Sequence, residues 1–267
     1  MAFKLLFALC LLACYWPARA ATKLIVTVTE QKTGRAITDL KAADFTVLDD
    51  KTPRTVESAE TAGGALDIML LIDTSMVGAM VQPLAADLIG QLQPKEQMAV
   101  VSFHSSADLI QDFTSSKQLL NAAVQSVKYG NSPRVLDALY AALDGGFQSS
   151  DFRRVALVLT TGFEAPGNME EKDVVRLARK NGVSIFPVYA VGSARSLFER
   201  LARYSGGAIF NVSDMKKAGV QKPGATIFEA MRQHYVLTIS GNQDPGEKLK
   251  ITVNRPDKLN VSALITE

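Results

Sequence analysis

The sequence predicts an α/β protein: a doubly wound, mostly parallel sheet covered by helices, with a small β unit formed by the N- and C-terminal strands. Two observations lead to this fold class. Short segments in the middle of the chain are dense in Val, Ile and Leu and alternate with amphipathic segments, the pattern of a parallel sheet covered on both faces. Towards both ends the chain alternates apolar and polar residues between turn signals, which is typical of antiparallel strands.

The predicted strands of the central sheet are residues 66–73, 98–104, 154–162, 183–192 and 207–212. Apolar residues spaced three or four apart predict helices over residues 81–92, 135–143, 169–181, 197–202 and 228–233. Ser132 followed by Pro133 predicts an N-cap and a first helical residue, and Asn181 before Gly182 predicts a helix end. Residues 107–114 follow a tight turn and predict an antiparallel edge strand.

These patterns divide the chain into four regions. We expect a signal peptide over residues 1–20, an N-terminal β segment over 21–64, the α/β domain over 65–234, and a C-terminal β segment over 235–267 that pairs with the N-terminal one. Within the first β segment, Asp49, Asp50 and Lys51 predict the turn of a hairpin.

The first twenty residues have the features of a secretory leader. Lys4 precedes an apolar run, and Ala18-Arg19-Ala20 fits the small-x-small cleavage rule. We therefore expect a secreted, periplasmic or otherwise extracytoplasmic protein. No later stretch approaches the ~20 apolar residues that span a bilayer. Lipidation at Cys14, within a loosely lipobox-like Leu11-Leu12-Ala13-Cys14, is the less favoured alternative.

Cleavage after residue 20 has two chemical consequences. Both cysteines, Cys10 and Cys14, lie in the leader, so the rest of the chain has no thiol for redox chemistry or metal binding. Lys4 and Arg19 are the leader's only charged residues, so the formal net charge of +2 disappears with them. This balance gives no indication of a nucleic acid partner.

An acid and a serine, Asp73-x-Ser75, end the first strand of the α/β region. Together with the order of strands and helices, this resembles the von Willebrand factor A (VWA) domain, a Rossmann-like fold. The flanks resemble a secreted bacterial VWFA-related family; they read "GRAITDLKAADFTVLDDKTPRTVE" and "HYVLTISGNQDPGEKLKITVNRP". The resemblance implies binding loops at the carboxyl ends of the strands, where open α/β sheets usually hold ligands.

VWA domains hold a divalent ion at a metal-ion-dependent adhesion site, and the resemblance implies that this chain keeps a degenerate version. Asp73 and Ser75 match the first ligands, but Val77 replaces the second serine of the D-x-S-x-S loop. Pro133 stands at the threonine position and Thr161 at the aspartate position. Because small divalent cations need several oxygen ligands, we expect no cofactor, or at most weak Mg²⁺ or Mn²⁺ binding at a remnant of Asp73 and Ser75.

The remaining polar residues have interpretations that need no metal. The helix dipole can stabilise Asp73, and the Ser75 hydroxyl can cap the following helix. Glu164 is expected to be a solvated loop acid. The rival interpretation is a working divalent site that uses Asp73, Ser75, Ser132 and Glu164.

The sequence therefore predicts a secreted, non-enzymatic VWA-type binding or adhesion module whose partner is a protein or a cell-envelope component. Recognition is expected at loops 73–78, 130–134 and 161–167. The candidate partner-binding residues are Asp73, Ser75, Met76, Val77, Ser132, Arg134, Thr161 and Glu164.

Other interpretations depend on different residues. Met76, Val77 and Met80 either offer an adaptable surface or, for Val77 and Met80, begin the buried face of a helix. A third class of function is a structural spacer subunit of an envelope complex. No catalytic residue is predicted: His104 lies beside serines in "SFHSS", but no G-x-S-x-G elbow accompanies it.

Overall fold

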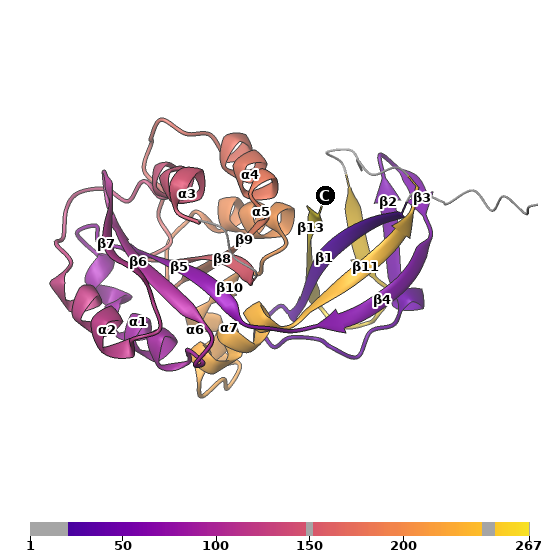
Figure 1. The fold of residues 1–267 in the computed structure, drawn as a ribbon, viewed down its shortest axis with the longest axis horizontal. Helices are drawn as coiled ribbons and strands as arrows, with labels where there is room; N and C mark the ends of the chain where they lie inside the picture. Colours follow the sequence, from indigo (N-terminus) through magenta and orange to yellow (C-terminus); the bar gives the residue numbers. More distant parts are fainter. Residues whose placement is uncertain (1–20, 148–151, 242–248, 267) are drawn as a thin grey trace, which may run out of the picture.

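The computed structural model describes residues 21–147, 152–241 and 249–266, so the predicted signal peptide lies outside the described residues. A six-stranded sheet forms one half of the molecule (Figure 1), in the order β10-β9-β8-β5-β6-β7. Its strands are β5 (Leu66–Asp73), β6 (Gln97–Phe103), β7 (Ala107–Thr114), β8 (Arg153–Thr160), β9 (Val183–Tyr189) and β10 (Phe210–Asn211). All pairs are parallel except β6 with β7. The predicted fold class is confirmed.

Helices cover both faces of this sheet because alternate side chains of the buried strands point to opposite sides. On one face, Leu70 of β5 packs with α1 (Gln82–Gly90), α2 (Lys117–Ser126), α6 (Val212–Lys217) and α7 (Pro223–Arg232). On the other face, Leu71 packs with α3 (Val135–Gly145), α4 (Glu171–Lys180) and α5 (Arg195–Ser205). None of the described helices is both long and apolar enough to cross a membrane.

Some elements differ from the sequence prediction. Helices α2 and α6 were not predicted, because their buried faces are small: α2 buries Leu120, Ala123 and Val124, and α6 buries Met215. The strand predicted over residues 207–212 shortens to β10. The last helix begins at Pro223, five residues earlier than predicted, because proline suits the first turn.

The β unit contains two antiparallel sheets beside the α/β half (Figure 1). The four-stranded sheet has the order β13-β1-β11-β4, with β1 (Ala21–Glu30), β4 (Val56–Ala62), β11 (His234–Ser240) and β13 (Leu259–Thr266). The other sheet joins β12 (Lys250–Val253), β2 (Phe45–Asp49) and β3 (Thr52–Arg54). Short 3-10 helices are η1 (Ala42–Asp44) and η2 (Gly78–Met80).

Strands from the two ends of the described chain pair directly in this unit. Val26 of β1 is opposite Tyr235 of β11 on one side and Ala263 of β13 on the other. The Tyr235 ring packs edge-on against Phe45 of the second sheet, with ring centroids 5.3 Å apart. The predicted hairpin is confirmed, and Asp50 and Lys51 adopt the left-handed conformation at its turn.

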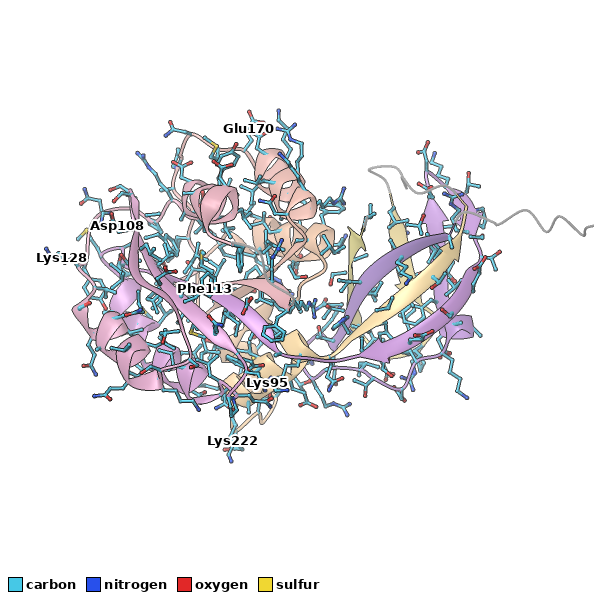
Figure 2. All side chains as sticks on the ribbon, viewed as in Figure 1. Lys95, Asp108, Phe113, Lys128, Glu170 and Lys222 are labelled. Carbon is cyan, nitrogen blue, oxygen red and sulfur yellow. The ribbon has the colours of Figure 1, made fainter. Side chains whose placement is uncertain are left out.

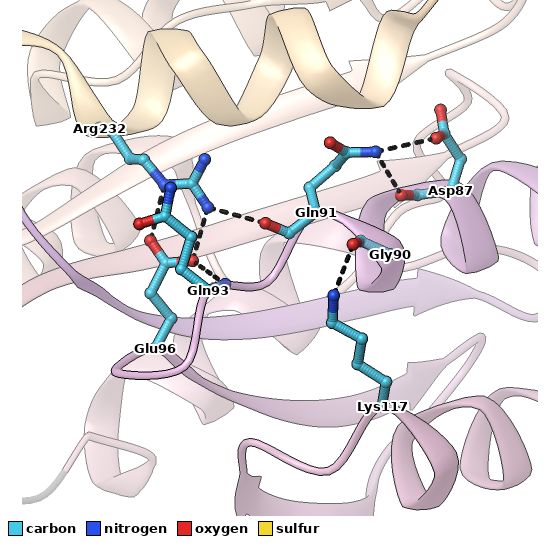
Figure 3. Close-up of polar contacts among 7 residues, drawn as sticks. All are labelled: Asp87, Gly90, Gln91, Gln93, Glu96, Lys117 and Arg232. Atoms are coloured by element: carbon cyan, nitrogen blue, oxygen red, sulfur yellow. Dashed lines mark hydrogen bonds and ion pairs between the residues drawn. The ribbon is translucent and has the colours of Figure 1, made fainter.

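A buried ion pair fixes the end of α7, close to the return of the chain to the β unit. Glu96 is fully buried and accepts hydrogen bonds from Arg232 Nε at 2.7 Å and Nη2 at 2.6 Å (Figure 3). The backbone N–H of Gln93 donates to the same carboxylate at 2.8 Å, and Arg232 also donates to the Gln91 carbonyl at 2.8 Å. Helix α7 is thereby tied to the segment between α1 and β6.

We predict that Glu96→Ala lowers the free energy of unfolding by about 3–5 kcal/mol, because it leaves the Arg232 charge without its buried partner. Urea denaturation measures this loss. Glu199→Ala is the control, since its ion pair with Arg195 is largely exposed and should contribute less than about 1 kcal/mol. Equal losses in the two variants would contradict the prediction.

Candidate functional site

The three loops predicted as the binding site meet at the carboxyl ends of the parallel strands. The Gly130 N–H donates to the Thr74 carbonyl at 2.8 Å, which joins the first loop to the second. The Ala165 N–H donates to the Pro133 carbonyl at 2.8 Å, which joins the second loop to the third. Figure 2 places Lys128, just before the second loop, on the side of the molecule that faces away from the β unit.

Asp73, at the end of β5, is the buried centre of this face. Its side chain is 0% exposed. Oδ2 accepts hydrogen bonds from Thr160 Oγ1 at 3.0 Å, from the Thr161 N–H at 3.0 Å and from Thr161 Oγ1 at 2.7 Å. Oδ1 accepts from the Ser75 N–H at 2.9 Å. Both carboxylate oxygens therefore accept hydrogen bonds from neutral donors. Thr161 donates two of these four hydrogen bonds.

Ser75 behaves differently from the capping role that its sequence context suggested. Its Oγ is buried and has no hydrogen-bond partner among the described residues. Neither η2 nor α1 has a side-chain cap hydrogen bond at its N-terminus. The chain turns tightly here because residue 78 is glycine: a Cβ at Gly78 would collide with the Asp73 carbonyl oxygen.

Glu164 is not a solvated loop acid. Its carboxylate accepts hydrogen bonds from the backbone N–H groups of Val135 at 2.7 Å and Leu136 at 3.2 Å. These are among the first N–H groups of α3, which have no partner within the helix. Asp137 makes the reverse connection, since its Oδ1 accepts from the N–H groups of Asn168 and Met169, both at 2.8 Å.

The predicted cap of α3 is also corrected by the structure. The helix begins at Val135, with Arg134 as its N-cap, so Ser132 and Pro133 precede it. Glu164, from another loop, accepts from the first N–H groups of α3. The helix therefore does not need a capping hydroxyl from the residue that precedes it in the chain. Ser132 is exposed, and the Arg134 N–H donates to the His104 carbonyl at 2.9 Å.

Large apolar side chains surround this polar centre on the solvent side. Of the nine exposed large apolar residues that the structure describes, three lie in these loops and three more lie close to them in the chain or in the loop after β9. We call them the apolar rim: Met76, Val77, Met80, Tyr129, Phe163 and Val191, with exposed fractions from 42% to 81%. Val77 and Met80 therefore do not begin a buried helical face.

Three rim residues were not named as candidates from the sequence, although Phe163 lies within the predicted loop 161–167, and they share a signal that could have found them. Tyr129, Phe163 and Val191 each stand next to a glycine in a loop. The Val191 N–H donates to the Thr161 carbonyl at 3.1 Å, so the loop after β9 joins the same face. Burial and the charge of Asp73 raise the pKa of Tyr129, which is consistent with a phenol close to the buried carboxylate.

A divalent ion fits these residues poorly. It would compete with four donors for Asp73, while Glu164 is already bound to the start of α3. Among the described residues, no group of three or more His, Cys, Asp or Glu side chains could hold a metal. One observation favours an ion: the unpartnered Ser75 Oγ fits an oxygen ligand.

Comparison with known proteins gives one family. The model of the von Willebrand factor type A domain matches residues 67–223, more than half of the chain. No curated protein matches the sequence.

Two solved structures are similar in fold. Proximal thread matrix protein 1 from the mussel byssus, with a zinc-occupied metal-ion-dependent adhesion site motif, is 19% identical with a TM-score of 0.55, over 69% of this chain and 50% of that protein. The chain thus spans half the length of that mussel protein. An aerotolerance-related membrane protein from Bacteroides fragilis is 13% identical with a TM-score of 0.50, over 63% of this chain and 98% of that protein.

The Glu164 carboxyl predicts a pH dependence of stability. Burial raises its pKa from an ordinary value of 4.5 to about 7, although its two backbone hydrogen bonds oppose the shift. Between these values the folded protein holds a proton that the unfolded chain has lost, so stability falls as the pH rises through this window. We expect urea denaturation at pH 5 and pH 8 to show this loss, at most about 3 kcal/mol.

Glu164→Gln is the control, because glutamine keeps an oxygen acceptor near α3 but does not titrate. The wild type should lose more stability between the two pH values than this variant does. An identical pH dependence in both proteins would exclude Glu164 as its source.

Proposed function

Because the chain belongs to the von Willebrand factor type A domain family, we propose that it is a non-enzymatic protein-binding or adhesion module. It acts outside the cytoplasm, as the leader-like residues 1–20 suggest, and its partner is a protein or a cell-envelope component. Binding takes place at the loops that follow β5, β8 and β9, together with the loop before α3. A divalent ion has little or no part in it.

The apolar rim is the observation that carries this proposal. Met76 is 81% exposed and Met80 60% exposed. The loops that carry Met76, Phe163 and Val191 are joined by backbone hydrogen bonds at the carboxyl ends of the strands. Contiguous exposed apolar side chains on a globular domain usually mark a contact surface, and methionine adapts its shape to a partner. The loops that hold the rim are fixed by backbone hydrogen bonds, which supports recognition by a surface formed before the partner arrives.

The contacts of Asp73 support recognition without a metal. In a divalent site, the cation balances the acidic ligands and pulls the loops together. Here Thr160, Thr161 and Ser75 supply hydrogen bonds to the same carboxylate and tie the first loop to the third. The loops therefore have a structural link that does not depend on an ion.

We predict that Met76→Asp combined with Phe163→Asp weakens partner binding more than tenfold, since charges would enter the centre of an apolar contact. Quantitative co-purification from the native envelope, followed by titration of the purified partner, measures the effect. The matched control is Leu109→Asp with Leu119→Asp, which changes exposed apolar residues of β7 and α2 and should leave binding unchanged.

The same assay tests the spacer alternative. A spacer would bind through the β unit, so Glu57→Lys with Glu60→Lys on the exposed side of β4 would abolish capture while the rim variant would not. That outcome would overturn rim binding.

A second candidate, a divalent adhesion site, is favoured by the unpartnered Ser75 Oγ and by the zinc-occupied motif of the mussel protein. Its ligands would be Asp73, Ser75, Ser132 and Glu164. Against it, Glu164 would have to leave the N–H groups of α3 to reach a cation.

We predict that 10 mM Mg²⁺ or Mn²⁺ shifts the melting temperature of the wild type by less than about 1 °C. The same metal concentration should raise the melting temperature of the triple variant Val77→Ser, Pro133→Thr, Thr161→Asp by about 3–5 °C. Thr161→Asp would place a second carboxylate beside Asp73, and a bound cation would balance the two negative charges. A metal-dependent shift of the wild type that vanishes in Asp73→Ala would favour the divalent site instead.

A further inference from the structure

The β unit has two free strand edges that belong to consecutive strands of the chain. β12 ends the three-stranded sheet, and β13 ends the four-stranded sheet. Among the described strands, β12 pairs only with β2, and β13 pairs only with β1. One edge of each strand therefore has backbone N–H and C=O groups that no described neighbouring strand engages. We call these two edges the seam.

A cavity of about 670 Å³ runs along the seam. Its lining includes residues 249–253, which contain the whole of β12, and residues 259–263 of β13. Because neighbouring side chains of a strand point to opposite faces of the sheet, these consecutive residues indicate that the cavity touches the edge of each strand. The opposite wall is formed by α5, which lies next to β13 (Figure 1), and by residues 207–209.

The α/β half closes the seam near the end of β13. Ser262 Oγ donates to the Gly207 carbonyl, and a Cβ at Gly206 would collide with Leu264. The edge of β12 has no such contact, and all four of its residues line the cavity. At about 3.3 Å per residue, this edge is roughly 13 Å long. It can therefore pair with about four residues of an extended segment.

The acidic residues of the cavity wall already have cationic neighbours. The charged lining residues are Arg179, Glu199, Arg203, Lys250 and Asp257. Glu199 forms an ion pair with Arg195 at 2.8 Å, and Asp257 lies 4.0 Å from Arg255. Both of these arginines lie outside the lining, so the negative charges of the wall are balanced from elsewhere.

The basic residues of the wall are not balanced in the same way. Arg203 of α5 and Lys250 of β12 are exposed and form no ion pair among the described residues. Arg179 donates to the Tyr204 carbonyl at 2.9 Å and lies over the ring of the same tyrosine. The cavity therefore offers positive charge on both sides of the seam, from α5 and from β12.

A free strand edge binds an extended peptide by continuing the hydrogen-bond ladder of its sheet, and side chains beside the edge select the peptide. We propose that the seam binds an extended, acidic segment of a partner protein, which adds as a strand to β12. Arg203 and Lys250 attract its carboxylates. This contact is separate from the apolar rim, so either surface can fail its test without the other.

A segment of another protein suits the seam better than a second copy of this chain. The acidic strand that this chain offers is β4, which exposes Glu57 and Glu60. β4 is already held in its own sheet by β11. A strand bound in this way would have to leave its sheet before it could enter the space between α5 and β12.

Fluorescence anisotropy on the full chain tests the proposal with labelled peptides of about eight residues, a usual strand length. The probe alternates valine with aspartate. A second peptide has lysine in place of aspartate. A third keeps the aspartates but carries N-methyl groups on alternate backbone nitrogens, which removes donors that a ladder requires.

The test variant combines Arg203→Gln with Lys250→Gln. Its matched control combines Arg200→Gln with Lys222→Gln. Arg200 also belongs to α5, but it pairs with Glu171, and neither Arg200 nor Lys222 lines the cavity. All four side chains are exposed, so both double variants are expected to fold.

We expect the aspartate peptide to bind the wild type and the control variant equally, and the test variant about tenfold more weakly. The lysine peptide and the N-methylated peptide should bind the wild type at least about tenfold more weakly than the probe does. Hydrogen exchange should show slower exchange of β12 amides when the probe is bound, with β4, the free edge at the other end of its sheet, unchanged.

Several results would overturn the proposal. These are no binding of the probe to the wild type, equal binding of the N-methylated peptide, equal binding of the probe to both double variants, or protection of β4 in place of β12. Sedimentation of the chain without peptide gives a further check. A dimer that dissociates in the test variant but not in the control would assign the seam to a second copy.

Discussion

The carboxylate of Asp73 stands at the end of β5, in the middle of the six-stranded sheet and out of contact with solvent. A buried carboxylate is tolerated only when its lone pairs are matched, and here donors from two loops match them. Thr160 and Thr161 close the end of β8 onto the end of β5, while the Ser75 N–H bends the first loop back over its own strand. The positions of the other loops depend on this arrangement.

Two further carboxylates extend the same principle. Glu164 accepts two backbone N–H groups from the start of α3, and Asp137 of α3 accepts two from the loop that follows Glu164. The acids of this face are therefore used for internal connection. Their use leaves the outer surface to apolar side chains such as Met76 and Phe163. A face that is polar inside and apolar outside suits contact with another protein better than capture of an ion.

The sequence predicted the four inner strands of the central sheet well because β5, β6, β8 and β9 are dense apolar runs buried on both faces. It predicted α2 and α6 poorly because their buried faces are short and their stability comes from packing. At the site, the loops were predicted from the family resemblance, but the role of Glu164 was not. A carboxylate that caps a helix 28 residues earlier in the chain leaves no local sequence pattern, whereas the usual capping signal, Ser132 with Pro133, was present and misleading.

Arg153 presents the opposite electrostatic problem at the other end of the strands. Asp73 has a donor for each carboxylate oxygen, whereas Arg153 keeps one buried N–H unused and finds only neutral acceptors among the described residues. Arg153 bonds to residues of both halves and so helps to hold them together. The two charged groups thus stabilise different parts of the molecule. Asp73 holds the loops together at the carboxyl ends of the strands, and Arg153 ties the β unit to the α/β half at their amino ends.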